Sequence, residues 1–335
     1  MRRINSRLTI NGKVLPFFSE IEIKDGRNDF TATAKIKIPN RISKRGKKIT
    51  DQIELGSPVQ IELGYYPNLF LQFEGYVSQL VPEKTAEIIC ENEAYIYKRK
   101  NIGKDLVLKN TNTNKLVPMI YDGFADVADI NIGDWKISKS STLIEVLAEL
   151  QSKYKIYSYF RGKTLVVGAS ADTMHKKEIK AHFQENIPAG ESEYNFKDTE
   201  ADRIATKTST VGRDGKVQNT YAYYEGTPQK ITYSSTEPNN YTINEMTIGG
   251  QSGLTEEDRR DLGRIRLEAL TFTGVDGKIT LYGRDADNYP VHGDIANVTD
   301  LEIPEKNGKF AIVETLTKVS KENGIRTEIT LGVSV

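Results

Sequence analysis

Three histidines are the first residues in this sequence that could bind a metal or transfer a proton: His175, His182 and His292. His175 and His182 lie seven residues apart, which on a helix is too far for their imidazoles to chelate one metal ion unaided. The HExxH spacing of zinc enzymes does not occur in the sequence. His292 directly precedes Gly293 and Asp294, so we interpret it as a turn residue. The histidines therefore predict neither a metal site nor a general base.

Paired acidic residues suggest glycoside hydrolysis, which needs two carboxyl groups about 5–10 Å apart across a cleft. Glu91 with Glu93, and Glu191 with Glu193, are each two residues apart. On a strand such pairs share one face, because side chains alternate with a period of two. We interpret both pairs as solvated strand edges, and a hydrolase stays the alternative.

A calcium loop is suggested by the acidic start of the segment Asp285-Ala-Asp287-Asn288. Tyr289 and Pro290 then stand where further oxygen ligands and the glycine of the sharp turn should follow. The segment therefore predicts a surface loop.

Motifs for phosphate binding and nucleophilic catalysis are absent from the sequence: it has no P-loop, no GxGxxG after a strand and no GxSxG elbow. Gly249-Gly-Gln-Ser-Gly253 has glycines but no following Lys-Ser or Lys-Thr, so it predicts a flexible lead into a helix. Cys90 is the single cysteine and lies in an alternating stretch, which indicates a small buried hydrophobe. One cysteine excludes an intrachain disulfide and a cysteine-based zinc cluster. We expect no catalytic residue, no metal ligand and no cofactor.

Length and charge set further limits. The chain has 335 residues, more than the roughly 250–300 that one hydrophobic core serves, so we expect two or three domains. Its 46 basic and 46 acidic residues cancel to a formal net charge of +0, which argues against gripping nucleic acid by bulk electrostatics. No stretch approaches the ~18 apolar residues of a membrane span, and no apolar segment of a signal peptide follows the first residues. The basic run Arg41–Lys48 is interpreted as a solvated loop, with a patch for phosphate or an acidic partner as the alternative.

Hydrophobic periodicity divides the chain into three parts. Residues 1–100 alternate with a period of two, as in Phe30–Ile38 and Val59–Leu63, and predict a first small β-barrel or sandwich. Residues 101–198 predict an α+β domain, with a helix over Ser140–Tyr154 and a hairpin over residues 156–167. In the helix, Ser141 or Thr142 can serve as the N-cap.

Residues 199–335 return to strand patterns and predict a second β-barrel or sandwich. This part includes an Asp-Gly hairpin turn at Asp214-Gly215 and a helix over residues 255–269 with Thr255 as its N-cap. We therefore predict a mainly β chain in which two small barrels bracket a helix-plus-hairpin insert. The two barrels are expected to be separate and to superpose.

This order of elements resembles the hub proteins of contractile phage tails and related injection machines, which include the late control gene D family and the hub half of VgrG-type spikes. Three segments carry the resemblance: Gly56-Ser-Pro-Val-Gln-Ile-Glu-Leu-Gly-Tyr with Phe73-Glu-Gly-Tyr-Val-Ser, then Ser141–Gly168, and lastly Tyr289–Val298 with Phe310-Ala-Ile-Val-Glu. The similarity extends over nearly the whole chain as an order of elements, and none of its motifs is catalytic.

The resemblance implies a non-enzymatic baseplate hub that forms a homotrimeric ring and adapts a hexameric tail tube to a trimeric spike. It implies a virion or injection-apparatus location after assembly in the bacterial cytoplasm, and a channel that passes DNA or a tape-measure protein. No short-period glycine repeat of the spike type occurs, and the sequence ends in what reads as the closing strand of the second barrel, so we expect a separate spike protein. The segments Phe30–Ile38, Val59–Leu63, Ile279–Leu281 and Ile329–Leu331 are expected to form edges between subunits.

Two other classes remain open. One is a tail-associated cell-wall hydrolase of glycan or peptide. The other is a glycan-binding β module, for which Tyr65, Tyr66, Tyr223 and Tyr224 are the stacking candidates. Adjacent tyrosines on a strand point to opposite faces, so at most one of each pair could stack on a sugar.

Overall fold

The computed structural model describes residues 4–40, 48–169, 177–188, 192–198, 203–212, 214–226, 230–251, 253–271, 273–282 and 289–334. The chain divides into two compact units, each built from separate stretches of sequence. The first contains residues 1–96, 175–195 and 275–335, and the second contains residues 97–174 and 196–274. The predicted boundaries at residues 100 and 198 lie close to two of the points at which the chain passes from one unit to the other. The passages at residues 174 and 274 were not predicted. The division into three domains stays a prediction.

The first unit is built on a sheet of 13 strands in the order β14-β19-β22-β21-β3-β4-β7-β6-β5-β1-β2, with β20 attached to β21 and β13 attached to β20. Its strands are β1 (Ile4–Ile10), β2 (Lys13–Leu15), β3 (Glu20–Gly26), β4 (Thr33–Pro39), β5 (Pro58–Tyr65), β6 (Phe70–Val81), β7 (Thr85–Glu91), β13 (Glu178–His182), β14 (Ser192–Asp198), β19 (Thr273–Tyr282), β20 (Ile295–Thr299), β21 (Gly308–Ser320) and β22 (Gly324–Ser334). A short helix α1 (Ala94–Tyr97) and two 3-10 turns, η1 (Thr50–Gln52) and η3 (Pro304–Lys306), complete its regular structure.

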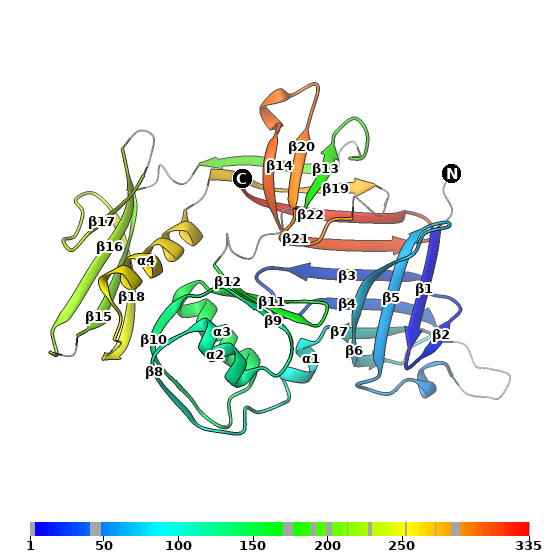
Figure 1. Cartoon of the computed structure of the whole chain (residues 1–335). Coiled ribbons are helices and arrows are strands. Elements are labelled where there is room, and N and C mark those ends of the chain that lie inside the picture. Colours follow the sequence, from blue (N-terminus) through cyan, green and yellow to red (C-terminus); the bar gives the residue numbers. More distant parts are fainter. Residues whose placement is uncertain are drawn as a thin grey trace. The chain divides into compact units, whose positions relative to one another are not determined.

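Strands from the two ends of the sequence pair directly in this sheet. β3 and β21 form an antiparallel ladder with Glu20 opposite Ser320 and Gly26 opposite Glu314. In Figure 1 the blue β3 lies beside the orange-red β21. Val319 and Ile325 accordingly belong to the same hydrophobic cluster as Ile21 and the other buried residues of the N-terminal strands. A second cluster forms around β13, β19, β20, β21 and β22.

The prediction of a mainly β fold with an α+β insert is confirmed, but the two barrels are not found. No sheet closes into a barrel within the described residues. A first barrel could close only if β3 had a free edge. That edge is already paired with β21. One continuous sheet runs through both terminal segments, so the expectation of two separate barrels is wrong.

The second unit contains three smaller sheets with the strand orders β10-β8, β11-β12-β9 and β17-β16-β15-β18. Its strands are β8 (Leu106–Asn112), β9 (Ala125–Val127), β10 (Asn131–Ile137), β11 (Tyr157–Arg161), β12 (Thr164–Gly168), β15 (Ile204–Val211), β16 (Val217–Glu225), β17 (Lys230–Ser234) and β18 (Thr242–Gln251). Its helices are α2 (Thr113–Ile120), α3 (Leu143–Tyr154) and α4 (Glu256–Leu270).

Helix α3 begins where the sequence predicts. Thr142 is the N-cap and forms a capping box with Glu145, in which each side chain bonds the other residue's backbone N–H. The predicted apolar stripe is buried, and it consists of Leu143, Val146, Leu147, Leu150 and Tyr154. The hairpin of β11 and β12 follows, with Gly162 at φ +58 in its turn.

Helix α4 packs on the four-stranded sheet of the second unit. Thr255 is its N-cap, as predicted, and the side chain of Asp258 completes a capping box. Gly263 lets the helix approach closely: the Thr206 hydroxyl donates to the Gly263 carbonyl over 2.8 Å, and a Cβ at Gly263 would lie 3.3 Å from Cβ of Ala222. The hairpin of β15 and β16 turns near Gly215, which has φ +78.

Candidate functional site

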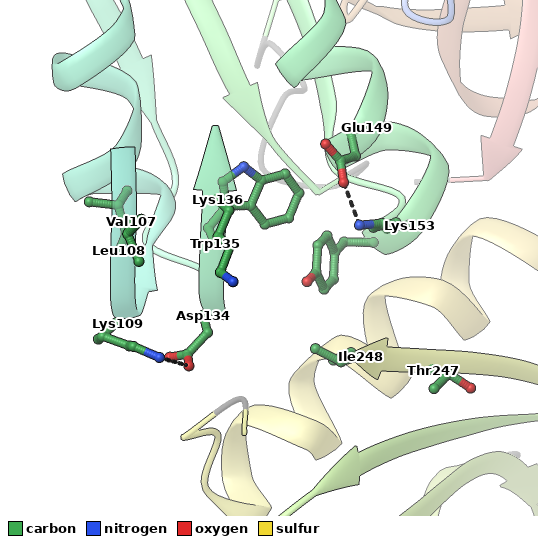
Figure 2. Close-up of a pocket in the computed structure, with 11 residues that line it drawn as sticks. Val107, Leu108, Lys109, Asp134, Trp135, Lys136, Glu149, Lys153, Thr247 and Ile248 are labelled. Carbon is green, nitrogen blue, oxygen red and sulfur yellow. Dashed lines mark hydrogen bonds and ion pairs between the residues drawn. The ribbon is translucent and has the colours of Figure 1, made fainter. Parts of the chain in front are cut away.

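A hollow in the second unit brings together aromatic and charged side chains from four elements. It has a volume of about 570 Å³ and is lined from β8, β10, α3 and β18. Figure 2 shows Trp135 on β10, with Lys153 of α3 on one side and Ile248 of β18 below. Trp135, Tyr154 and Ile248 form the floor of the hollow. Their side chains are largely apolar and buried, with exposed fractions of 4%, 2% and 4%.

Local packing fixes the aromatic floor. The rings of Trp135 and Tyr154 have centroids 5.7 Å apart with an interplanar angle of 42°. The Tyr154 hydroxyl donates to the Ile132 carbonyl over 3.1 Å, and burial raises the pKa of this phenol above its ordinary value. The ammonium of Lys153 lies 5.2 Å from the centroid of the Trp135 ring, which is within cation–π range.

The charges of the hollow are mostly paired. Lys109 Nζ lies 3.0 Å from Oδ2 of Asp134, while Oδ1 of Asp134 accepts from the backbone N–H of Asn110. Lys153 pairs with Glu149 one turn away on α3. Both ion pairs are drawn in Figure 2, and they leave Lys136 as a further cation on the exposed side of β10.

This arrangement combines an aromatic ring with several charged groups and is suited to binding. The eleven lining residues include no histidine, cysteine or serine. An aromatic floor with lysines at its rim can hold an anionic or aromatic group. The sequence signals for this hollow were the single tryptophan in an alternating strand and the i, i+4 pair of Glu149 and Lys153; neither was singled out in advance.

The predicted histidine positions do not come together as a metal site. His175 lies outside the described residues. His182 ends β13, where its Nδ1 accepts from the backbone N–H of Gln184. His292 lies in a turn, as predicted, but it is 3% exposed and its Nδ1 is 3.1 Å from Oδ2 of Asp25. In the described part of the chain, no group of three or more His, Cys, Asp or Glu residues is placed to hold a metal ion.

The acidic pairs do not form a catalytic cleft in the described residues. Glu91 ends β7 and Glu93 follows in the turn before α1, where its carboxylate accepts from the hydroxyl of Tyr76 over 3.4 Å. Glu193 is exposed on β14, whereas Glu191 and the segment Asp285–Asn288 lie outside the described residues.

The remaining predicted positions have structural roles where they can be described. Cys90 is fully buried in β7, as predicted, and burial raises the pKa of its thiol to about 12. Gly249-Gly-Gln is not a flexible lead into α4, because β18 continues to Gln251 and pairs with β15. The basic run falls outside the described residues except for Lys48, whose backbone N–H donates to Asp51.

The four tyrosines proposed for glycan stacking do not form a common platform. Tyr65 is partly buried, and its hydroxyl accepts from the backbone N–H of Ile325 over 3.4 Å. Tyr66 is 72% exposed in the turn that follows. Tyr223 packs against Tyr241 with centroids 4.9 Å apart, while the carbonyl of Tyr224 accepts from the Tyr241 hydroxyl.

The segments predicted as subunit edges lie inside the sheet. β4 pairs with β3 and β7, β5 with β1 and β6, and β22 with β19 and β21. Their apolar residues are buried in the two hydrophobic clusters of the first unit. The prediction that these segments form edges is therefore wrong, because their alternation serves the cores of this chain. Within the described residues the main path of the long sheet ends at β2 and β14, and its side branch ends at β13.

Comparison with known proteins identifies the fold and not the family. No family profile matches the sequence, and no curated protein matches it. Among solved structures, the fold is that of phage tail proteins and of proteins from type VI secretion systems.

Three solved structures illustrate this similarity. The 43 kDa tail protein of prophage MuSo2 from Shewanella oneidensis is 14% identical, with a TM-score of 0.62 over 98% of this chain and 97% of that one. A tail protein from Neisseria meningitidis is also 14% identical, with a TM-score of 0.64 over 98% and 96%. An Escherichia coli component of the type VI secretion system is 10% identical, with a TM-score of 0.53 over 98% and 76%.

Proposed function

We propose that this protein is a structural component of a phage tail or of a phage-like contractile injection apparatus, where it acts without catalysing a reaction. The observation that carries the proposal is the agreement in fold with phage tail proteins over 98% of the chain. No helix of the described residues is long and apolar enough to cross a membrane. On the strength of the similarity in fold, the particle proposed to contain the protein is a virion tail or an injection apparatus.

The more specific form of the proposal is a baseplate hub. In this form three copies make a ring that joins a hexameric tail tube to a separate trimeric spike protein. DNA or a tape-measure protein passes through the ring. The resemblance in sequence order to hub proteins supports this form, as does the similarity to a type VI secretion component.

The ends of the long sheet are the contact surfaces that this role would use. β2 and β14 are the terminal strands of its main path, so within the described residues one backbone edge of each has no neighbouring strand; β13 ends the side branch through β20. Such edges readily pair with another chain. Each carries an exposed apolar side chain, since Val14 on β2 is 59% exposed and Phe196 on β14 is 61% exposed.

Assembly can be tested with lysine substitutions at these edges. Val14→Lys and Phe196→Lys should lower the mass of the assembled protein in light scattering, because a charge on an edge strand opposes pairing with another strand. Val217→Lys is the matched control: Val217 is 65% exposed but lies on β16, which pairs with β15 and β17. A strict monomer at tens of micromolar under several salt conditions would contradict the ring, and equal effects of all three substitutions would contradict the role of the edges.

The hydrolase alternative makes a separate prediction. We expect the purified protein to leave peptidoglycan intact in a turbidity assay, and Glu91→Gln and Glu193→Gln to change neither this result nor assembly. Lytic activity that one of these substitutions abolishes, but the control Glu83→Gln does not, would favour a tail-associated hydrolase.

A further inference from the structure

A second hollow of the second unit, here termed the α4 hollow, lies against the first turns of helix α4. It has a volume of about 770 Å³. Residues from β16, from β17 and the residue after it, and from α4 line it: Val217, Gln218, Asn219, Thr220, Tyr233, Ser234, Ser235, Glu256, Arg259 and Arg260. It is separate from the hollow of Figure 2, with which it shares no residue.

Arg259 is the buried cation of the α4 hollow. The residue is only 8% exposed. Its Nε donates to the hydroxyl of Thr220 over 3.1 Å, and its Nη1 donates to Oε1 of Gln218 over 2.9 Å and to the carbonyl of Leu254 over 3.1 Å. All three acceptors are neutral. Nη2 has no hydrogen-bond acceptor among the described residues.

The charge of Arg259 has no counter-charge in the described part of the chain. Two of the three arginines that follow it on α4 do: Arg260 pairs with Glu256, and Arg264 pairs with Glu268. No carboxylate oxygen of the described residues lies within the 4.0 Å ion-pair distance of Arg259. An arginine stays protonated in proteins, and a buried charge is costly unless it is paired. The hollow therefore presents a preformed cation that receives no counter-charge from the described residues.

We propose that the α4 hollow binds a carboxylate side chain from an extended acidic segment of a partner protein, with Arg259 as its anchor. The free N–H groups of Nη2 would donate to the carboxylate, and the neutral polar side chains of Asn219 and Ser234 line the same hollow. Glu256 does not oppose the anion with a full charge, because Arg260 neutralises it.

Two features favour a protein segment over a free phosphate ion. The buried cation is a single guanidinium whose direct hydrogen-bond acceptors are neutral, so its one positive charge matches the one negative charge of a carboxylate. β17 is also the terminal strand of its sheet within the described residues, so an extended segment can pair along its outer edge beside the hollow. The inference holds whether or not the protein assembles into a tail.

Fluorescence anisotropy of the full chain with a labelled peptide of alternating threonine and glutamate tests the inference. We expect this peptide to bind, and the same peptide with glutamine in place of glutamate to bind about tenfold more weakly or worse, since a hydrogen bond to a charged group is lost. Arg259→Gln should lower the affinity for the glutamate peptide by a similar factor. Arg264→Gln, a substitution on the same helix but outside the hollow, should leave the affinity for the glutamate peptide unchanged.

A second variant keeps the test decisive if Arg259→Gln does not fold. Ser235→Trp fills the exposed rim of the hollow and leaves Arg259 in place, so it should also weaken binding of the glutamate peptide. The inference is overturned if the glutamate peptide does not bind, or if its affinity is the same in the wild type and both hollow variants. Saturable binding of inorganic phosphate without binding of the peptide would overturn the assignment to a protein segment.

Discussion

Replacing Ile325 by alanine should loosen the N-terminal strands, although Ile325 lies only ten positions from the last residue of the sequence. Ile325 is 1% exposed on β22 and belongs to the hydrophobic cluster of β1, β3, β4, β5, β6 and β7. The substitution removes three carbon atoms, worth about 0.8 kcal/mol each in transfer from water. The cavity left behind adds to this, so we expect the free energy of unfolding of the first unit to fall by about 3–4 kcal/mol.

The assay combines urea unfolding with hydrogen exchange of peptides that cover β3. In Ile325→Ala the amides of Glu20–Gly26 should exchange faster, because they pair with β21 in the same cooperative sheet. Ile303→Ala is the matched control: Ile303 is 45% exposed, and its loss should cost less than about 1 kcal/mol. If Ile325→Ala speeds exchange only in β21 and β22 and leaves β3 protected, the continuous sheet is refuted.

Three further predictions concern local features of the fold. Thr142→Ala removes the N-cap of α3 and should lower the free energy of unfolding by about 1 kcal/mol in urea titrations, whereas the exposed Ser140→Ala should have little effect. The hydrogen bond and charge of Arg7 lower the pKa of Glu62 below its ordinary 4.5, so the pair stabilises the fold fully above pH 4.5 and loses this contribution as the pH falls through the folded pKa. Arg7→Gln should therefore reduce the dependence of stability on pH in this acid range. If the free energy of unfolding of Arg7→Gln falls with acid as steeply as that of the wild type, the pairing is contradicted. The thiol of Cys90 should not react with a disulfide reagent at pH 8 in the native protein and should react in urea, because its pKa is raised to about 12; rapid native reaction would show that the strand is not buried.

Local signals in the sequence predicted the helices and hairpins well. The Thr142 and Thr255 caps specify where α3 and α4 begin, since a hydroxyl that accepts from the backbone satisfies an otherwise free N–H group. The period-two alternation of residues 33–39 identified β4 and which side chains it buries. These features depend on residues a few positions apart.

Pairing between distant segments was not predictable from the same signals. Alternation says which face of β3 is buried, but it does not say that β21, almost 300 residues later, is its partner. Alternation and strand number do not specify whether a sheet closes on itself, and here β3 pairs with β21 of the C-terminal segment. The burial of Arg259 was also not predictable from the sequence, because a charged residue on the predicted helix 255–269 is typical of a solvated face.

Quantitative mass spectrometry of purified tails or tail-like particles tests the central claim most directly. Particles isolated from cells that make this protein should contain it in a fixed number of copies, three per particle for the proposed hub, at a constant ratio to the tube protein. Particles that are complete and functional without this protein would contradict the proposed role.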